Sequence, residues 1–335
     1  MAIKAPELDV VLSCRVRLAR NYEDIPFTAT MTPEWAEETV RRARQAVENA
    51  DGEYECHLMK DLSGDARSHL VEHHLISYDL LKYPEISAAL IRKDHNISVM
   101  VNEEDHLRIQ ALMPGLQPDE AARLAFDADD MLSSAGKFAF DRQFGFLTSC
   151  PTNTGTGMRA SAMLHLPALT ITNRISAVIQ AISKLGLTVR GLYGEGSDAR
   201  GCLYQLSNQI TLGRSEEDIV KTLVAATSQL AAQERSVRNQ LREQDAMSLY
   251  DRLMRSIGLM ANARMMGAVE FMQRYSDLRM AVSMDMVDAR LWEVDGMMMD
   301  LQNASLNIYA QHDMNDRERD ILRADRLRER IKNLT

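Results

Sequence analysis

The chain has 335 residues, 45% of them hydrophobic, and carries a formal net charge of −9. This length and composition can supply a large core and predict two domains, and the acidic balance argues against a nucleic-acid-binding protein. The first residues show no apolar signal-type segment, and no apolar run reaches membrane-spanning length. The four cysteines include no C-x-x-C pair, so neither a zinc site nor a disulfide framework is predicted. We therefore expect a cytoplasmic protein without membrane or nucleic-acid partners.

The first predicted strand, residues 11–18, alternates between polar and apolar side chains. One face carries Ser13, Arg15 and Arg17, and the other carries Cys14, Val16 and Leu18. Two arginines on one strand face repel each other unless an anion lies over them. A solvated edge strand would tolerate the same pattern. The pattern alone leaves both interpretations open.

Three consecutive carboxylates, Glu103, Glu104 and Asp105, stand at a break between two predicted strands. Such a run is costly unless a cation or a basic substrate faces it, although a solvated turn would also accommodate it. Arg108 follows in the alternating segment 107–111, opposite the apolar face. A second cationic group therefore lies close in sequence to the acidic run.

A Gly/Thr-rich loop begins at Cys150, after a predicted strand at 144–148, and ends at Arg159. Its backbone N–H groups, threonine hydroxyls and arginine predict a phosphate site with a thiol beside it. It lacks the Gly-Lys-Ser/Thr of a P-loop. The spacing of its glycines loosely matches a dinucleotide fingerprint, but residues 159–167 alternate and predict a strand. A helix is predicted only at 173–185, so a nicotinamide enzyme remains a minor alternative.

The next predicted strand, 187–189, runs into Arg190 and then into a loop with three glycines and Glu195. Glycines at these positions favour a loop that closes over a site. Glu104, Glu195 and the Cys150 thiol together suit a guanidinium substrate, which is planar, cationic and very weakly acidic. Carboxylates can hold a guanidinium through paired hydrogen bonds, and one of them can accept its proton.

The last third of the chain is predicted to be all helical. All eight prolines lie at or before Pro167, and residues from Ser215 onward favour helix. Apolar residues recur there at helical spacing: Ile219, Leu223, Leu230, Val237 and Leu241. We expect a mixed first domain over 1–220 and a helical regulatory or dimerisation domain over 221–335.

Four motifs in order resemble the catalytic domain of the phosphagen (guanidino) kinases. They are Ser13–Arg17, Asn102–Arg108, Cys150–Asn153 with Arg159, and Arg190–Glu195, and the similarity spans roughly residues 8–220. The resemblance implies an α+β fold of the glutamine-synthetase-like kind, an antiparallel sheet flanked by helices, with ATP and Mg²⁺ as cofactors. It implies nucleotide contacts from Ser13, Cys14, Arg15, Val16, Arg17, His74, Arg108, Arg159, Ala160, Ser161, Ala162, Met163, Arg190, Gly191, Leu192, Tyr193 and Gly194.

The same resemblance implies the catalytic roles. Glu104 is the expected base, Glu195 its loop partner, and Cys150 the residue that orients the guanidinium. Glu103 is expected near Mg²⁺ through water, with no direct protein ligand to the metal. The nucleotide-contacting histidine is expected to be His74, with the neighbouring His73 as the alternative.

Two departures favour one branch of this family. The small helical domain that precedes the catalytic domain in creatine and arginine kinases is missing before Ser13, and Met100 replaces a tryptophan. The sequence is thus most similar to bacterial protein-arginine kinases of the McsB type, which implies that arginine side chains of proteins are phosphorylated. A kinase of free arginine and a non-catalytic phosphoarginine-binding module remain alternatives. The resemblance further implies stress-response regulation, a homodimer, and as partners a Clp ATPase/protease, a zinc-binding activator and a heat-shock repressor.

A fifth motif lies near the C-terminus. Arg319, Asp320, Arg323 and Ala324 fit the R-D-x-x-R-A pattern of that branch, which is similar to an allosteric phosphoarginine pocket. At helical spacing the two arginines share a face, as a doubly charged phosphate requires. An ordinary charged terminal helix is the alternative.

Overall fold

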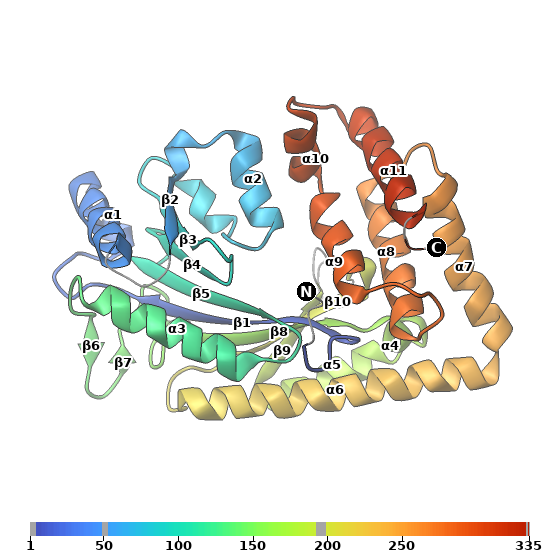
Figure 1. The fold of residues 1–335 in the computed structure, drawn as a ribbon. Coiled ribbons are helices and arrows are strands. Elements are labelled where there is room, and N and C mark those ends of the chain that lie inside the picture. Colours follow the sequence, from blue (N-terminus) through green and yellow to red (C-terminus); the bar gives the residue numbers. More distant parts are fainter. Residues whose placement is uncertain (1–4, 49–52, 192–198, 333, 335) are drawn as a thin grey trace.

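A computed structural model describes residues 5–48, 53–191, 199–332 and 334. A large antiparallel sheet with covering helices is followed by a region built only of helices (Figure 1). The predicted α+β class followed by a helical part is confirmed. Within the described residues, no helix is both long enough and apolar enough to span a bilayer.

The main sheet has eight strands in the order β2-β3-β4-β5-β1-β8-β10-β9, and all neighbouring strands are antiparallel. Its strands are β1 (Val11–Arg20), β2 (Tyr54–Leu58), β3 (Ala88–Arg92), β4 (Ile97–Val101), β5 (Leu107–Pro114), β8 (Met158–His165), β9 (Leu187–Gly191) and β10 (Leu203–Asn208). A short separate ribbon pairs β6 (Phe140–Asp141) with β7 (Gly145–Phe146).

β1 lies in the middle of the sheet, between β5 and β8. The predicted alternation is confirmed, because Cys14, Val16 and Leu18 are fully buried on one face while the arginines point to the other. The edge-strand interpretation is wrong. Register pairs Arg17 with Gln110 of β5 on one side and with Arg159 of β8 on the other.

Helices cover the apolar face of the sheet. α3 (Pro118–Ser133) and α6 (Glu216–Gln244) run along it, with α4 (Pro167–Ile171) and α5 (Ile175–Ser183) beside α6 (Figure 1). α6 begins where expected, because the Ser215 hydroxyl accepts a hydrogen bond from the Asp218 N–H and acidic residues fill the first turn. α1 (Pro33–Glu48) and α2 (Gly64–Glu72) flank the β2 end of the sheet.

Two predicted elements differ from the structure. The predicted strand at 144–148 is only β7, because Gly145 has φ of +77° and the residues after Phe146 turn into the loop that begins at Cys150. The predicted helix at 173–185 is α5, preceded by the separate short α4.

The helical region contains α7 (Ala246–Asn262), α8 (Ala268–Ser283), α9 (Leu291–Asp300), α10 (Asn303–Ala310) and α11 (Asp316–Lys332). Buried charges join it to the sheet. Arg279 of α8 is fully buried and donates to the carbonyls of Leu8 and Asp9, just before β1, and to Asp295 of α9. The predicted boundary at 220/221 lies inside the continuous α6.

Candidate active site

Five arginines from four strands share the polar face of the sheet. They are Arg15 and Arg17 of β1, Arg108 of β5, Arg159 of β8 and Arg190 of β9. Their charges interact across the strands. Burial, followed by the charges of Arg108 and Arg159, lowers the pKa of Arg15 to about 10. Burial and then Arg190 and Arg108 lower the pKa of Arg159. The structure therefore brings the predicted cationic residues together.

Most of this charge is uncompensated. Arg108 forms an ion pair with Glu103, but among the described residues none of the other four arginines has a carboxylate partner. Arg15 reaches only Gln110 at 3.4 Å, and Arg159 donates to the Ser207 hydroxyl at 3.0 Å. A buried cation without a partner is costly. A ligand with several anionic oxygens would offset that cost through charge-assisted hydrogen bonds.

Two arginine Nε atoms on this face also indicate an anionic ligand. The Nε atoms of Arg17 and Arg159 are buried, and neither has a hydrogen-bond partner among the described residues. Buried polar atoms in folded proteins are usually paired, so two unpaired donors on one face indicate a missing acceptor. Phosphate oxygens are acceptors of the required charge and geometry.

His74 lies against this face, and His73 does not. The His74 carbonyl accepts a hydrogen bond from Gln110 Nε2 at 2.7 Å, and among the described residues its own Nε2, like that of His73, is buried without a partner. Burial, followed by the charge of Arg15, lowers the pKa of His74 to about 4. His73 instead packs against His69, with ring centroids 4.1 Å apart and the rings tilted by 44°. Of the two histidines, His74 is the one beside the arginines.

The acidic run forms a tight turn between β4 and β5. Asn102 has φ of +60°, and its side-chain amide donates to the carbonyls of Ala36 and Ile86, which fixes the turn. Glu103 points inward and accepts hydrogen bonds from Ser77 and Arg108. It is therefore held in place rather than solvated.

Glu104 is left facing the loop that begins at Cys150. Burial, followed by the charges of Asp105 and Glu103, raises its pKa above the ordinary value of 4.5. The Asn153 side chain donates to Glu104 Oε2 at 3.3 Å. A carboxylate whose charged form is disfavoured and which points into an open site is suited to proton transfer.

Asp105 connects the acidic turn to the loop. Its Oδ1 accepts hydrogen bonds from Asn21 Nδ2 at 2.7 Å and from the Ser149 N–H at 2.6 Å. Asn21 also accepts from the His106 N–H. Asp105 is therefore a structural residue. Because it follows Glu104 and bonds to Ser149, which precedes Cys150, it fixes the position of Glu104 relative to Cys150. The sequence gives no signal for Asn21, which is separated from Asp105 by 84 positions.

The loop itself differs from the predicted phosphate cradle. The N–H groups of residues 153–156 all bond to carbonyls of the protein, so they are not free to bind phosphate. Gly155 has φ of +115°, and a Cβ there would lie 2.7 Å from the Thr211 carbonyl oxygen. The loop therefore packs against the segment after β10. Its function in the site is to present Cys150, whose Sγ lies 3.0 Å from Thr152 Oγ1.

The remaining predicted nucleotide contacts divide by strand face. Ser13, Ser161 and Met163 share the parity of the arginines. Cys14, Val16, Ala160 and Ala162 have the opposite parity and are buried in the core, so their side chains do not reach the arginine face. Gly191 ends β9. Leu192, Tyr193, Gly194 and Glu195 lie outside the described residues.

The C-terminal motif is placed mostly inside the protein. Arg323 is fully buried and donates to the carbonyls of Leu301 and Met266 and to the side chains of Asn303 and Asp320. Ala324 is also fully buried. Arg319 is partly buried, lines a cavity of about 580 Å³, donates to the Met314 carbonyl and pairs with Asp316. The two arginines are neighbours, but the N–H donors of Arg323 are largely committed to the fold.

Comparison with known families explains both parts of the chain. Residues 36–237 match the ATP:guanido phosphotransferase C-terminal catalytic domain, and residues 246–335 match the C-terminal domain of the protein-arginine kinase McsB. The first match ends within α6, and the second begins just after α6 ends at Gln244. The chain therefore belongs to the ATP:guanido phosphotransferase family and is an enzyme of that kind, in the protein-arginine kinase branch.

Similar proteins agree with this assignment. A protein-arginine kinase from Moorella thermoacetica is 45% identical over 332 residues, covering 97% of this chain and 94% of the relative. One from Caldanaerobacter subterraneus subsp. tengcongensis is 43% identical and covers 95% of each. Among solved structures, the duplicated taurocyamine kinase from Schistosoma mansoni is 29% identical with a TM-score of 0.62, over 72% of this chain and 35% of that one. A lombricine kinase, 21% identical with a TM-score of 0.60 over 70% of this chain and 68% of that one, has the same fold.

Proposed function

We propose that this enzyme transfers the γ-phosphoryl group of ATP to arginine side chains of proteins. The observation that carries the proposal is the set of unpaired arginine donors on the sheet face, close to a carboxylate whose pKa is raised. The curated relatives named protein-arginine kinase, at 42–45% identity, support the choice of acceptor.

The proposed reaction is an in-line displacement. A guanidinium nitrogen of the acceptor bonds to the γ-phosphorus as the bond to the β–γ bridging oxygen breaks, which gives phosphoarginine and ADP. Glu104 accepts the proton that the nitrogen loses. The arginines stabilise the charge that develops on the phosphoryl oxygens and the leaving group, and positioning supplies most of the acceleration.

Mg²⁺ fits this site as a companion of the nucleotide. When bound, it supplies charge neutralisation between the β- and γ-phosphates. The nearest candidate carboxylate, Glu103, is already hydrogen-bonded to Ser77, Arg108 and the Glu104 N–H. Glu103 would therefore hold the ion through its hydration water, as the sequence resemblance implied, and Arg108 would keep Glu103 oriented.

The acceptor guanidinium is proposed to lie between Glu104 and Cys150. Asp105 fixes the positions of these two residues relative to each other through its hydrogen bonds with Asn21 and Ser149. A second carboxylate from Glu195 completes the predicted clamp, and that residue lies outside the described part of the chain.

The test is to incubate the enzyme with ATP, Mg²⁺ and an unstructured arginine-containing protein, and to map acid-labile phosphate by mass spectrometry. We expect phosphate on arginine with the wild type, and phosphate that appears about 10²–10⁴-fold more slowly with Glu104→Gln. Equal turnover of ATP on free arginine and on the protein would favour a phosphagen kinase of free arginine. Binding of phosphorylated protein without ATP consumption would favour a non-catalytic phosphoarginine-binding module.

The cellular role is proposed by family resemblance. Phosphoarginine would mark proteins for Clp-type proteolysis and regulate a heat-shock repressor in the cytoplasm, with a zinc-binding activator as a further partner. The helical domain would support self-association into a homodimer. Phosphoarginine binding near Arg319 would give allosteric control.

A further inference from the structure

A groove lies between α5 and α6, away from the arginines. It has a volume of about 650 Å³. Ile182 of α5 packs in the same core as Leu187 and Val189 of β9, whereas Arg190 has the opposite strand parity. The groove therefore lies on the helix-covered side of the sheet, and the proposed phosphoryl transfer does not use it.

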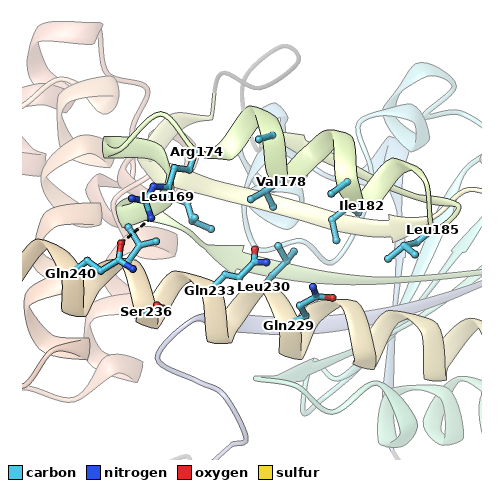
Figure 2. Close-up of a pocket in the computed structure, with 13 residues that line it drawn as sticks. Leu169, Arg174, Val178, Ile182, Leu185, Gln229, Leu230, Gln233, Ser236 and Gln240 are labelled. Carbon is cyan, nitrogen blue, oxygen red and sulfur yellow. Dashed lines mark hydrogen bonds between the residues drawn. The ribbon is translucent and has the colours of Figure 1, made fainter.

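The groove is apolar along its length and cationic at one end. Figure 2 shows Arg174 beside Leu169 and Gln240 at that end, with Val178, Ile182 and Leu185 following in a row. Side chains of α6 form the facing wall, among them Gln229, Leu230 and Gln233. None of the described residues that line the groove carries a carboxylate, although the whole chain is acidic.

Arg174 is available to an anion. Its Nη1 donates to Gln240 Oε1 at 2.9 Å, and it has no ion pair among the residues that the structure describes. A guanidinium has five N–H donors, so a carboxylate can still be held through paired hydrogen bonds. Gln240 keeps the guanidinium at the mouth of the groove.

We propose that this groove binds a linear long-chain carboxylate, with its head at Arg174 and its chain running along α5 to Leu185. A site of a few hundred cubic ångströms, mainly apolar with few polar groups that fix orientation, is typical for a small ligand. Eleven residues at helical rise span about 16 Å, the length of a saturated chain of about 12 carbons.

The lining favours such a chain, because a linear carboxylate has a single anionic head group and Arg174 is the one cation that lines the groove among the described residues. The exposed Ala177 and Ala181 on the α5 side leave a narrow trough that an extended methylene chain fills without displacing larger side chains.

Calorimetric titration of the full-length protein with octanoate, decanoate, dodecanoate and hexadecanoate, each below its aggregation concentration, tests the proposal. We expect one site per chain, with affinity rising roughly tenfold for each two carbons up to dodecanoate and then levelling off. Arg174→Ala should weaken dodecanoate at least tenfold and leave dodecanol, which has no charge, unaffected. Arg174→Lys should restore part of the loss.

Two variants of α5 give the matched control. Ala181→Trp fills the groove and should abolish dodecanoate binding, whereas Gln180→Trp, also exposed but outside the groove, should not. Dodecanoate binding that survives Ala181→Trp, or that keeps rising with chain length without depending on Arg174, overturns the proposal. The proposal is also overturned if a helical Leu/Glu peptide binds the protein and dodecanoate does not. If the protein bound phosphatidylglycerol vesicles but not free dodecanoate, the ligand of the groove would be a membrane lipid. That result would overturn the proposal of a free carboxylate ligand.

Discussion

Arg17 and Arg159 lie directly opposite each other on β1 and β8, and within the described part of the chain neither buried Nε has a partner. Like charges on facing strand positions destabilise a sheet. Burial, followed by the charges of Arg15, Arg108 and Arg159, lowers the pKa of Arg17. The pair therefore lowers the stability of the free protein and favours a bound polyanion.

Replacing Arg159 should separate these two effects. Arg159→Met removes one like charge, so we expect a higher melting temperature without nucleotide. We also expect ATP affinity to fall about 10- to 100-fold, because a hydrogen bond to a charged group contributes about 1.5–3 kcal/mol. Scanning calorimetry measures the melting temperature, and nucleotide titration measures the ATP affinity. Arg123→Met, at an exposed arginine of α3, is the control and should change neither. Unchanged ATP affinity in Arg159→Met would contradict the phosphate assignment.

Glu104 should set the acid limb of the pH–rate profile. The base acts when deprotonated, so kcat/KM rises as pH rises through its pKa, and burial with Asp105 and Glu103 moves that limb above the ordinary 4.5. Glu104→Gln should lower kcat by about 10²–10⁴-fold and remove the limb. A limb of unchanged position in Glu104→Gln would show that another group is the base.

The same carboxylate should affect stability with the opposite sign. A folded-state pKa raised above the unfolded value means that the protonated form is favoured by folding. Its stabilising contribution is present at pH below 4.5 and is lost as pH rises through the raised pKa. Glu104→Gln should therefore raise the melting temperature at pH 7 and leave it nearly unchanged at pH 4. A variant that is less stable than wild type at pH 7 would contradict this assignment.

The sequence predicts which side chains share a strand face, but it does not predict which strands pair with one another. Alternation at Arg15 and Arg17 is a local pattern, so both the strand and its polar face were predictable. That β1 lies in the centre of the sheet depends on pairing with strands about 90 and 140 residues away, which no local pattern reports. The loop after Cys150 was misread as a phosphate cradle because its N–H groups are satisfied by tertiary contacts.

The C-terminal motif shows the same limit. Helical spacing placed Arg319 and Arg323 on one face, but burial distinguishes them. Arg323 is fully buried and holds two main-chain carbonyls and two side chains, whereas Arg319 is partly buried and holds one main-chain carbonyl and Asp316. We expect Arg323→Ala to destabilise the helical domain by about 3–5 kcal/mol, because several buried polar groups lose their partner. Arg319→Ala should cost less than about 1 kcal/mol. Urea unfolding measures both.

This difference determines how the phosphoarginine pocket is tested. Arg319→Ala should retain the fold, so a loss of phosphoarginine binding in this variant reports on the pocket itself. A loss in Arg323→Ala would also follow from unfolding. Unchanged phosphoarginine affinity in Arg319→Ala, in protein with wild-type urea unfolding, would remove the pocket from this site.

The four cysteines should react at very different rates. Burial raises the pKa of Cys14 to about 12 and also raises the pKa values of Cys56 and Cys202, so these thiols are protonated at pH 8. Cys56, Cys150 and Cys202 are each partly exposed, and of these three Cys150 is the one that lies at the mouth of the site. Iodoacetamide at pH 8 should therefore alkylate Cys150 first, and activity should fall in step with that modification. Peptide mapping over time measures both, and Cys150→Ser should be resistant over the same interval. Inactivation that follows Cys14 or Cys202 instead would contradict the placement of Cys150 beside the acceptor.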